Sequence, residues 1–276
     1  MSIEDLVHRR FGIKLDVGAS MSENVTLENQ LNHRSYRHFR EKTIPTDLLT
    51  SLFSAAFSAP SKSDLQQCSV ILVRDKAKQR RIAKFSSSTR WVADAPLFMV
   101  WCGDNRRIRR LAEWRKHPFA NEHLDAFMNS AVDAAIVMQN FIVAAEAVGL
   151  GCCPVSEIRD QIAALSSELG LPEGVFPVAG LVVGWPSEEP ALSLRLPLEV
   201  TVHQDHYDDA NLLENVAAYD KRREASVPTP EDEQRLVEEY GISDEYGWSE
   251  NRTRQYSKPA RADFGAYIRK QGFSLE

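Results

Sequence analysis

The pattern of apolar and polar positions predicts short buried strands that alternate with helices. Apolar residues recur at helical spacing from Leu48 to Phe57, and Pro60 ends that helix. Continuous apolar runs of strand length follow at residues 68–73, 97–102 and 175–184. Residues 198–203 alternate apolar with polar positions, which predicts a fourth strand. Further helices are expected at residues 75–85, 158–169 and 207–223.

The longest apolar segment spans residues 131–150 and contains Asp133, Gln139, Asn140 and Glu146. A membrane span would bury these polar groups at a cost of a few kcal/mol each. A central helix can direct them at caps, side-chain partners or a subunit boundary, and we therefore predict a core helix. The glycines of residues 149–151 follow this helix, with Pro154 where a dinucleotide fingerprint has its third glycine, so Gly149 is interpreted as the end of the helix.

Composition and charge indicate a globular protein whose main partner is neither nucleic acid nor an anionic membrane. The chain has 276 residues, a formal net charge of -6 and a pI near 5.7. Its four cysteines show no spacing typical of a disulfide framework, and free, half-buried thiols are favoured over a strained bond between Cys152 and Cys153. Residues 1–11 lack an apolar run that would indicate a signal peptide. We expect a cytoplasmic protein.

Three regions are expected along the chain. Residues 1–27 form an N-terminal extension, a turn or two of helix followed by a loop around Gly18 and Ser20. Residues 28–210 form the main domain, which includes a polar, less regular insertion rich in Arg and Trp at residues 103–125. Residues 211–276 form a C-terminal extension that is too polar for a core of its own and wraps over the main body or over a partner subunit.

Residues 32–39, Asn-His-Arg-Ser-Tyr-Arg-His-Phe, are the candidate anion site. Guanidinium groups, a short hydroxyl and backbone N–H groups together suit the phosphate oxygens of a bound cofactor. A solvated basic run that leads into a helix explains these eight residues equally well.

Other site chemistries find little support. The chain has no Gly-x-Ser-x-Gly elbow, no Walker loop and no His-Glu-x-x-His motif. His203 and His206 stand three residues apart, but no Cys or carboxylate set completes a zinc site, and the nearby Asp205, Asp208 and Asp209 fit a solvated turn. No metal is expected.

Several motifs follow one another along the chain: residues 33–39, Ala59-Pro60-Ser61-Lys62-Ser63 leading to Gln67-Cys68-Ser69, residues 144–151, Gly184-Trp185-Pro186, Arg195-Leu196-Pro197, Trp248-Ser249 and residues 270–273. In this order they make the chain resemble the flavin-dependent nitroreductase family, and within it the oxygen-insensitive NADPH nitroreductase and flavin reductase branch. The resemblance runs from about residue 28 to the C-terminus. It implies an α+β fold with a mixed, mainly antiparallel central sheet flanked by helices. It also implies an intertwined homodimer joined by the long core helix, and FMN at the subunit boundary.

Carried over by position, the resemblance implies that His33, Arg34 and Ser35 meet the FMN phosphate together with Arg195. Tyr36 falls in the same motif, and Arg37 would lie against the pyrimidine edge of the flavin, where a guanidinium stabilises the negative charge of the reduced ring. The other residues implied to contact FMN are Ser61, Ser63, Gln67, Thr89, Pro154, Val155, Ser156, Glu157 and Ser193.

The chain departs from the family pattern at three of these positions. Ser156 and Glu157 replace a pair of glycines, which affects close backbone approach to the flavin, and Ser193 replaces a phosphate-gripping lysine. Arg222 and Arg223 remain after Tyr219-Asp220, but no clear pattern for the NADPH 2′-phosphate follows. NADPH or NADH is therefore expected as the electron donor.

The resemblance implies a ping-pong cycle in which hydride passes from the nicotinamide to the flavin and then to a small flat acceptor: a nitroaromatic, a quinone or a free flavin. Catalysis then needs no protein nucleophile, and Arg37 gives electrostatic support. Two alternatives remain from the residues alone. One is a catalytically inactive flavin-binding or sensor protein on the same fold, and the other is an interaction protein with a basic surface loop.

Overall fold

The computed structural model describes residues 2–14, 24–86 and 88–276, and the chain divides into two compact units. The sheet unit comprises residues 33–191 and 261–276, and the tail unit comprises residues 1–32 and 192–260. The loop predicted around Gly18 and Ser20 lies outside the described residues.

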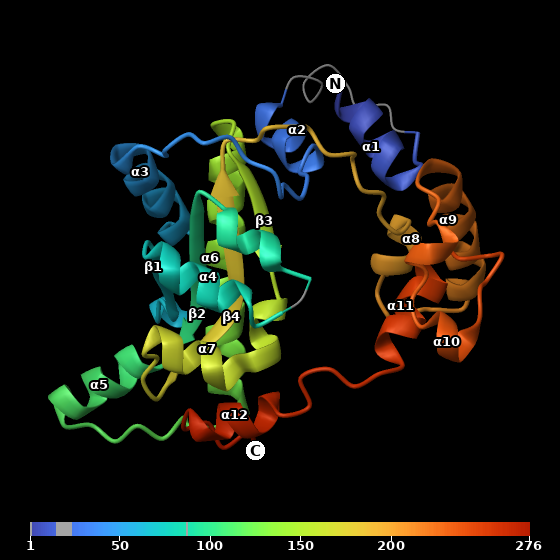
Figure 1. Cartoon of the computed structure of the whole chain (residues 1–276). Helices are drawn as coiled ribbons and strands as arrows, with labels where there is room; N and C mark the ends of the chain where they lie inside the picture. The colour runs from blue at the N-terminus through green and yellow to red at the C-terminus, as the bar shows by residue number, and fades with distance from the viewer. Residues whose placement is uncertain (1, 15–23, 87) are drawn as a thin grey trace. The chain divides into compact units, whose positions relative to one another are not determined.

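The sheet unit is built on a four-stranded antiparallel sheet with the strand order β1-β2-β4-β3 (Figure 1). The strands are β1 (Cys68–Val73), β2 (Leu97–Asp104), β3 (Gly151–Val155) and β4 (Val175–Gly184). This confirms the α+β class and the three strands predicted from apolar runs. The sheet was expected to be mixed, but the pairs between these strands are all antiparallel. Among the described residues, parallel pairing is limited to an isolated bridge between Ser35 and Cys152.

The predicted strand at residues 198–203 is wrong, because Leu198–Thr201 form the short helix α8. Pro197 precedes it, and the N–H of Val200 donates to the Pro197 carbonyl, as in a helical turn. The fourth strand is β3 instead. Gly149 has a φ of 82°, which favours glycine, and turns the chain from α6 (Leu124–Ala147) almost directly into β3.

Helices cover both faces of the sheet. Alternate strand residues such as Met99 and Trp101 pack with α3 (Thr46–Phe57) and α6 on one face. Phe98 and Val100 point to the other face and pack with α4 (Lys76–Ala83), the 3-10 helix η2 (Arg90–Asp94) and α7 (Ile162–Leu169). At one end, α12 (Phe264–Lys270) buries Tyr267 and Ile268 against the base of α6.

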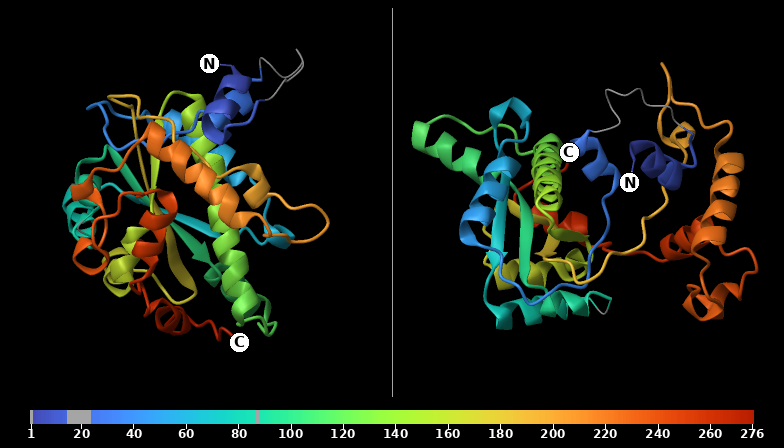
Figure 2. Two further views of the ribbon diagram at one scale, coloured as in Figure 1. Left: turned by 90° about the vertical axis from the view of Figure 1, so that its right-hand side faces the viewer. Right: turned by 90° about the horizontal axis from the view of Figure 1, so that it is seen from above.

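The long helix α6 begins seven residues before the predicted segment and lies beside the sheet, seen nearly end on in the right panel of Figure 2. Its length and composition alone would allow it to cross a membrane. In the fold, Ala134, Phe141 and Ala145 are fully buried against α3 and the sheet, as expected of a core helix.

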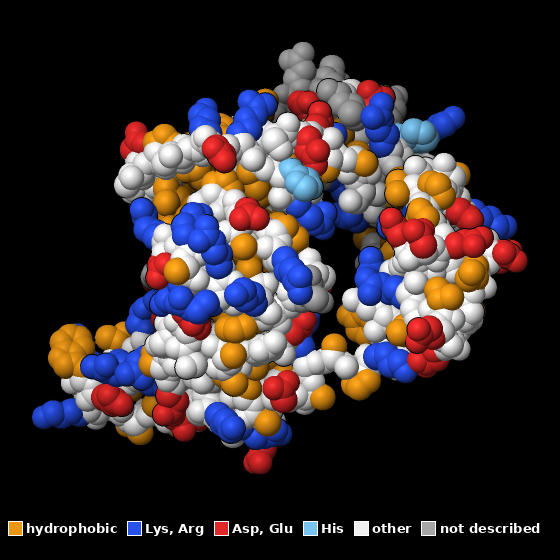
Figure 3. Space-filling view, viewed as in Figure 1, with side chains coloured by type: hydrophobic (Ala, Val, Ile, Leu, Met, Phe, Trp, Pro, Cys, Tyr) orange, Lys and Arg blue, Asp and Glu red, His pale blue; other side chains and the backbone are white. Residues whose placement is uncertain are grey.

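The region at residues 103–125 is more regular than predicted, because Arg106–Arg115 form helix α5. None of its side chains is buried, and basic and hydrophobic side chains lie together on the face seen in Figure 3.

The tail unit has a small interior of its own, contrary to the expectation from its polar sequence. Its helices are α1 (Ile3–Phe11), α2 (Val25–Leu31), α8, α9 (Leu212–Ser226), α10 (Val237–Tyr240) and α11 (Trp248–Tyr256). Arg254, 4% exposed, lies near its centre: the Nη1 atom donates to the carbonyls of Arg235 and Gly241 at 2.9 and 2.8 Å, and the Nε atom donates to Glu250. One buried cation thereby fixes the acidic segment onto α11.

The four cysteines are free and buried, more deeply than the half-burial expected. Burial raises the pKa of each thiol, and it raises the pKa of Cys68 to about 12.

Candidate functional site

The candidate anion stretch is extended and runs along the outer edge of β3. The N–H of Tyr36 donates to the Cys152 carbonyl at 3.0 Å, and Ser35 forms a bridge with Cys152. Gly151 lets the chain approach this closely, because a Cβ there would lie 2.5 Å from the Tyr36 ring. The sheet edge therefore holds the backbone of residues 35–36 in place.

Arg34 is the buried cation of this stretch, with 6% of its side chain exposed. Its Nη2 atom lies 2.8 Å from the Oε1 atom of Glu189, a carboxylate that is 69% exposed. Burial raises the pKa of Tyr36, and the neighbouring Arg34 opposes that shift. A fixed guanidinium thus faces an anion whose own side chain is solvated and able to move away.

His33 is oriented by the core helix. Its Nδ1 atom lies 2.6 Å from the Oε1 atom of Glu146, near the end of α6. With a proton on Nδ1, this contact fixes the ring and directs Nε2 away from the helix. Glu146 therefore positions one of the predicted phosphate ligands.

Arg37, Thr89 and Glu157 come together around the start of η2. The Arg37 guanidinium lies 5.9 Å from the centre of the Trp91 ring, and Thr89, which is buried, immediately precedes η2. The Oε2 atom of Glu157 accepts hydrogen bonds from the hydroxyls of Ser86, at 2.7 Å, and Ser88. The glutamate that departs from the family pattern thus anchors the segment beside Thr89.

Pro154, Val155 and Ser156 lie at the end of β3, an edge strand with no further named strand on its outer side within the described ranges. Val155 is buried, whereas Pro154 and Ser156 are exposed. An edge strand presents backbone N–H and C=O groups to whatever binds beside it. This arrangement allows backbone contacts to a ligand at Ser156 despite the missing glycine.

Ser61, Ser63 and Gln67 belong to a different place in the sheet unit. The buried carboxylate of Asp133 accepts hydrogen bonds from the Ser61 hydroxyl, the Lys62 N–H and the Gln67 N–H at 2.8, 3.1 and 3.0 Å. The Gln67 side chain is buried and accepts from Asn105 and Ser130, so in this chain it holds the interior of the loop. Ser63 is exposed at a φ of 51°.

The two groups of predicted site residues are separated along α6. Asp133 holds the serine loop and Glu146 holds His33, and these carboxylates are thirteen residues apart on one continuous helix. At 1.5 Å per residue this is about 20 Å. The serine loop and the anion stretch therefore do not form one compact pocket within the chain.

Ser193 and Arg195 lie in the tail unit, where both are exposed. The Ser193 carbonyl accepts from Arg10 Nη1 at 3.3 Å, and the Arg195 N–H donates to the Arg10 carbonyl at 2.8 Å. Arg222 adds a hydrogen bond from Nη2 to the Arg195 carbonyl at 2.9 Å. These backbone contacts leave the Arg195 guanidinium at the surface of this unit.

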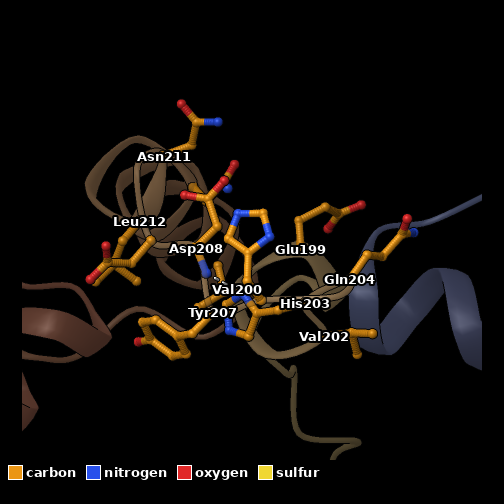
Figure 4. A pocket seen from close by; sticks show the side chains of 12 residues that line it. Glu199, Val200, Val202, His203, Gln204, Tyr207, Asp208, Asn211 and Leu212 are labelled. Carbon is orange, nitrogen blue, oxygen red and sulfur yellow. Dashed lines mark hydrogen bonds between the residues drawn. The ribbon is translucent and has the colours of Figure 1, made fainter.

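A pocket of about 290 Å³ in the tail unit contains the two histidines considered as metal ligands (Figure 4). The centres of the His203 and Tyr207 rings lie 4.4 Å apart, and the Asp208 N–H donates to the Nδ1 atom of His203 at 3.4 Å. Across the described ranges, no three His, Cys, Asp or Glu side chains are grouped so as to hold a metal ion.

Sequence reasoning missed the carboxylates that position this site. Asp133 and Glu146 were noted only as polar interruptions of an apolar segment, and Glu189 was not noted. A charged residue on the buried side of a helix must have a partner, so the first two carried a usable signal. Glu189 lies on an exposed loop and carried none.

The sequence of this chain matches known protein families and known relatives over most of its length. Residues 31–185 match the nitroreductase family, and residues 193–276 match the C-terminal domain of the nitroreductase family. The chain is 30% identical to the NAD(P)H-dependent FMN reductase of Bacillus subtilis over 257 residues, which are 92% of this chain and 99% of the relative. It is 31% identical to the oxygen-insensitive NADPH nitroreductase of Salmonella typhimurium over 251 residues, covering 90% and 98% of the two chains.

Solved structures of related proteins also match this chain over most of its length. NfrA2 of B. megaterium matches with a TM-score of 0.82 at 30% identity, over 92% of this chain and 99% of the other. The NADPH:FMN oxidoreductase of Vibrio harveyi in complex with NAD+ matches with a TM-score of 0.79 at 28% identity, over 92% of this chain and 100% of the other.

Proposed function

Because the chain belongs to the nitroreductase family and is an oxidoreductase of its NAD(P)H-flavin type, we propose that it reduces nitroaromatics, quinones or free flavin through FMN in a ping-pong cycle. FMN, when bound, accepts hydride from NADPH or NADH and passes it to the acceptor. The single observation that carries the cofactor assignment is the buried Arg34 guanidinium with its exchangeable carboxylate partner.

The contacts of Arg34 support a phosphate site. The Glu189 carboxylate stands in for a phosphate oxygen, since both are oxygen anions that a guanidinium binds at hydrogen-bond distance. Glu189 is mostly solvated, so its displacement costs little, whereas Arg34 is held by the fold. His33, fixed by Glu146, and Ser35, fixed at the edge of β3, would complete the grip.

Arg37 and the backbone at the end of β3 would act on the ring system. Arg37 is exposed beside Trp91, where its charge can offset negative charge that develops on the pyrimidine edge. The edge-strand backbone at Val155 and Ser156 would orient the ring. No side chain of this chain needs to act as a nucleophile.

We propose a homodimer in which each chain supplies half of each cofactor site. The serine loop and the anion stretch of one chain lie about 20 Å apart along α6, which suits a cofactor bound by one half-site from each of two chains. The exposed face of α6 supports this arrangement, because it carries Leu124, Met128, Val132 and Ile136 at four-residue spacing, each 37–60% exposed. We further infer that Ser193 and Arg195 contribute to the FMN phosphate site, as the family resemblance implies, and that the free thiols suit the reducing cytoplasm.

The proposal is tested by flavin content and turnover. Purified protein, reconstituted with FMN, should be yellow, bleach with NADPH or NADH, and regain colour with a quinone or nitroarene. The Arg34→Ala and Arg195→Ala variants should bind FMN at least about tenfold more weakly, because each removes a charge-assisted contact to the phosphate. The Arg80→Ala variant removes an exposed arginine on α4 and serves as the matched control. A protein that takes up no FMN would disprove the proposal.

A further inference from the structure

A second pocket, of about 600 Å³, lies in the sheet unit where residues 39–46 pass the end of β4 on their way to α3 (Figure 1). We name it the end pocket. The first turn of α3, the residues that follow β1 and the residues that precede β2 form its other walls. Its described lining includes neither residues 33–38 nor residues 154–157, so it is separate from the candidate flavin site. Its volume is within the range of small-molecule pockets.

The rim of the end pocket is cationic in an acidic protein. Arg40, Lys42, Arg74 and Lys76 line it. Only two carboxylates, those of Glu41 and Asp94, lie among the same lining residues, against a net charge of -6 for the whole chain. A local excess of positive charge with low-dielectric walls attracts anions.

Two of the four cations already have partners. The Lys76 Nζ atom donates to the carbonyls of Ala95 and Pro96 at 2.8 and 3.1 Å, and the Lys42 Nζ atom lies 3.9 Å from the centre of the Trp185 ring. By contrast, neither Arg40 nor Arg74 has a carboxylate within 4.0 Å among the residues that the structure describes. Two guanidinium groups on one rim are therefore available to an incoming anion.

The floor of the end pocket is apolar. Leu49 and Val73, 6% and 3% exposed, belong to the core, and Ile44 and Leu97 are partly buried beside them. A fully hydrated inorganic ion would gain nothing from such a floor, whereas a hydrocarbon would be removed from water.

The wall at residues 39–43 is held in place by the chain that leaves β4. Phe39 forms a bridge with Pro186, the Arg40 N–H donates to the Trp185 carbonyl at 2.8 Å, and the Trp185 Nε1 atom donates to the Thr43 carbonyl at 3.4 Å. The pocket is thus formed before any ligand arrives, which lowers the entropic cost of binding.

We propose that the end pocket binds a small amphipathic anion, of the class of medium-chain carboxylates, outside the flavin site. The hydrocarbon body rests on the floor at Leu49 and Val73, and the carboxylate is held at the rim by Arg40 and Arg74. No chemical step is involved, and the ligand is bound without being transformed.

Isothermal titration of the full chain, saturated with FMN, tests this with octanoate as the probe. One octanoate should bind per chain, and the neutral octanamide should bind about tenfold or more weakly, since it lacks the charge that the guanidinium groups recognise. Arg40→Ala and Arg74→Ala should each weaken octanoate binding by about tenfold. Arg80→Ala, which removes an exposed arginine of α4 outside the pocket, should leave it unchanged.

Arg40 and Arg74 are both exposed, so their replacement is compatible with folding, and the two variants report independently. A melting curve for each confirms that it is folded. No saturable binding of octanoate, equal affinity for octanoate and octanamide, or the same affinity in Arg40→Ala, Arg74→Ala and Arg80→Ala would each overturn the proposal.

Discussion

At the scale of single residues, the Arg34–Glu189 pair combines a fixed cation with an exchangeable anion. Arg34 is 6% exposed and Glu189 is 69% exposed. Moving the Glu189 side chain into solvent therefore costs less free energy than moving the Arg34 side chain. An ion pair of this kind contributes little to stability, because its carboxylate is largely hydrated. In the proposed phosphate site, the Glu189 carboxylate would compete with the ligand phosphate for Arg34.

We therefore predict that Glu189→Gln strengthens FMN binding by about three- to tenfold, because a neutral amide competes less well for the guanidinium. Titration of the apoprotein with FMN, followed by flavin fluorescence, measures the change. Glu188→Gln is the matched control, since Glu188 is similarly exposed and contacts His38 instead. Unchanged affinity in Glu189→Gln would mean that Arg34 does not hold the phosphate.

Asp133 illustrates a buried charge that is satisfied by its surroundings. Its carboxylate accepts three hydrogen bonds from the serine loop, two of them from backbone N–H groups. Asp133→Ala should reduce the free energy of unfolding by about 3 kcal/mol, because these buried donors lose a charged acceptor. Urea denaturation measures this. Asp125→Ala, on the exposed first turn of α6, should change the free energy of unfolding far less.

At the scale of elements, the exposed apolar face of α6 is the feature that a single subunit does not explain. Leu124, Met128, Val132 and Ile136 share this face. The opposite side of the helix is buried against α3 and the sheet. An exposed apolar stripe on a helix whose other side is already buried is typical of a subunit interface.

If the proposed homodimer forms through this face, Val132→Arg should shift the protein to a monomer, because the charge would be buried in the interface. Light scattering coupled to size-exclusion chromatography gives the mass directly. Arg80→Glu on α4, which packs on the other face of the sheet, should leave the dimer intact. If Val132→Arg and the unmodified chain have equal mass, the exposed face of α6 is not the interface.

Elements with one dominant signal could be predicted from the sequence, and elements set by tertiary contacts could not. The strand at residues 175–184 has a continuous apolar run, and the structure reproduces its limits. Residues 198–203 alternate, but six residues fit one helical turn as well, and Pro197 decides for the helix. β3 was not predicted, because its five residues include a glycine and a proline, and its pairing with β4 cannot be seen in the sequence.

In the candidate site, too, one part could be predicted from the sequence and another part depends on tertiary contacts. The anion stretch was predicted from residue types that suit phosphate, and its binding role stays a prediction. The distance between that stretch and the serine loop depends on the two positions on α6 that contact them, Glu146 and Asp133. The order of the motifs along the chain does not reveal these contacts.

At the scale of the whole molecule, the buried thiols couple stability to alkaline pH. Burial raises the pKa of Cys68 to about 12 from its ordinary value of 9.0, so the folded protein holds this proton where the unfolded chain loses it. The associated stability is fully present below pH 9 and is lost as the pH rises toward 12. Above pH 9, stability should therefore fall as the pH increases.

Urea denaturation at pH 8 and pH 10.5 checks this expectation. The Cys68→Ala variant should show a smaller alkaline loss than the unmodified chain, because one proton-linked group is gone. The quantity compared is the change in the free energy of unfolding between the two pH values. This change does not include any destabilisation that the substitution causes at both pH values. Equal changes in the two proteins would show that the Cys68 thiol does not contribute.

The continuity of α6 has a consequence for how this chain can change. An α-helix turns about 100° per residue, so inserting or deleting one residue between Asp133 and Glu146 would swing one carboxylate around the axis relative to the other. Ser61 and His33 could not both keep their partners. The interval between these two acids should therefore tolerate substitutions at its exposed positions but reject any change of length.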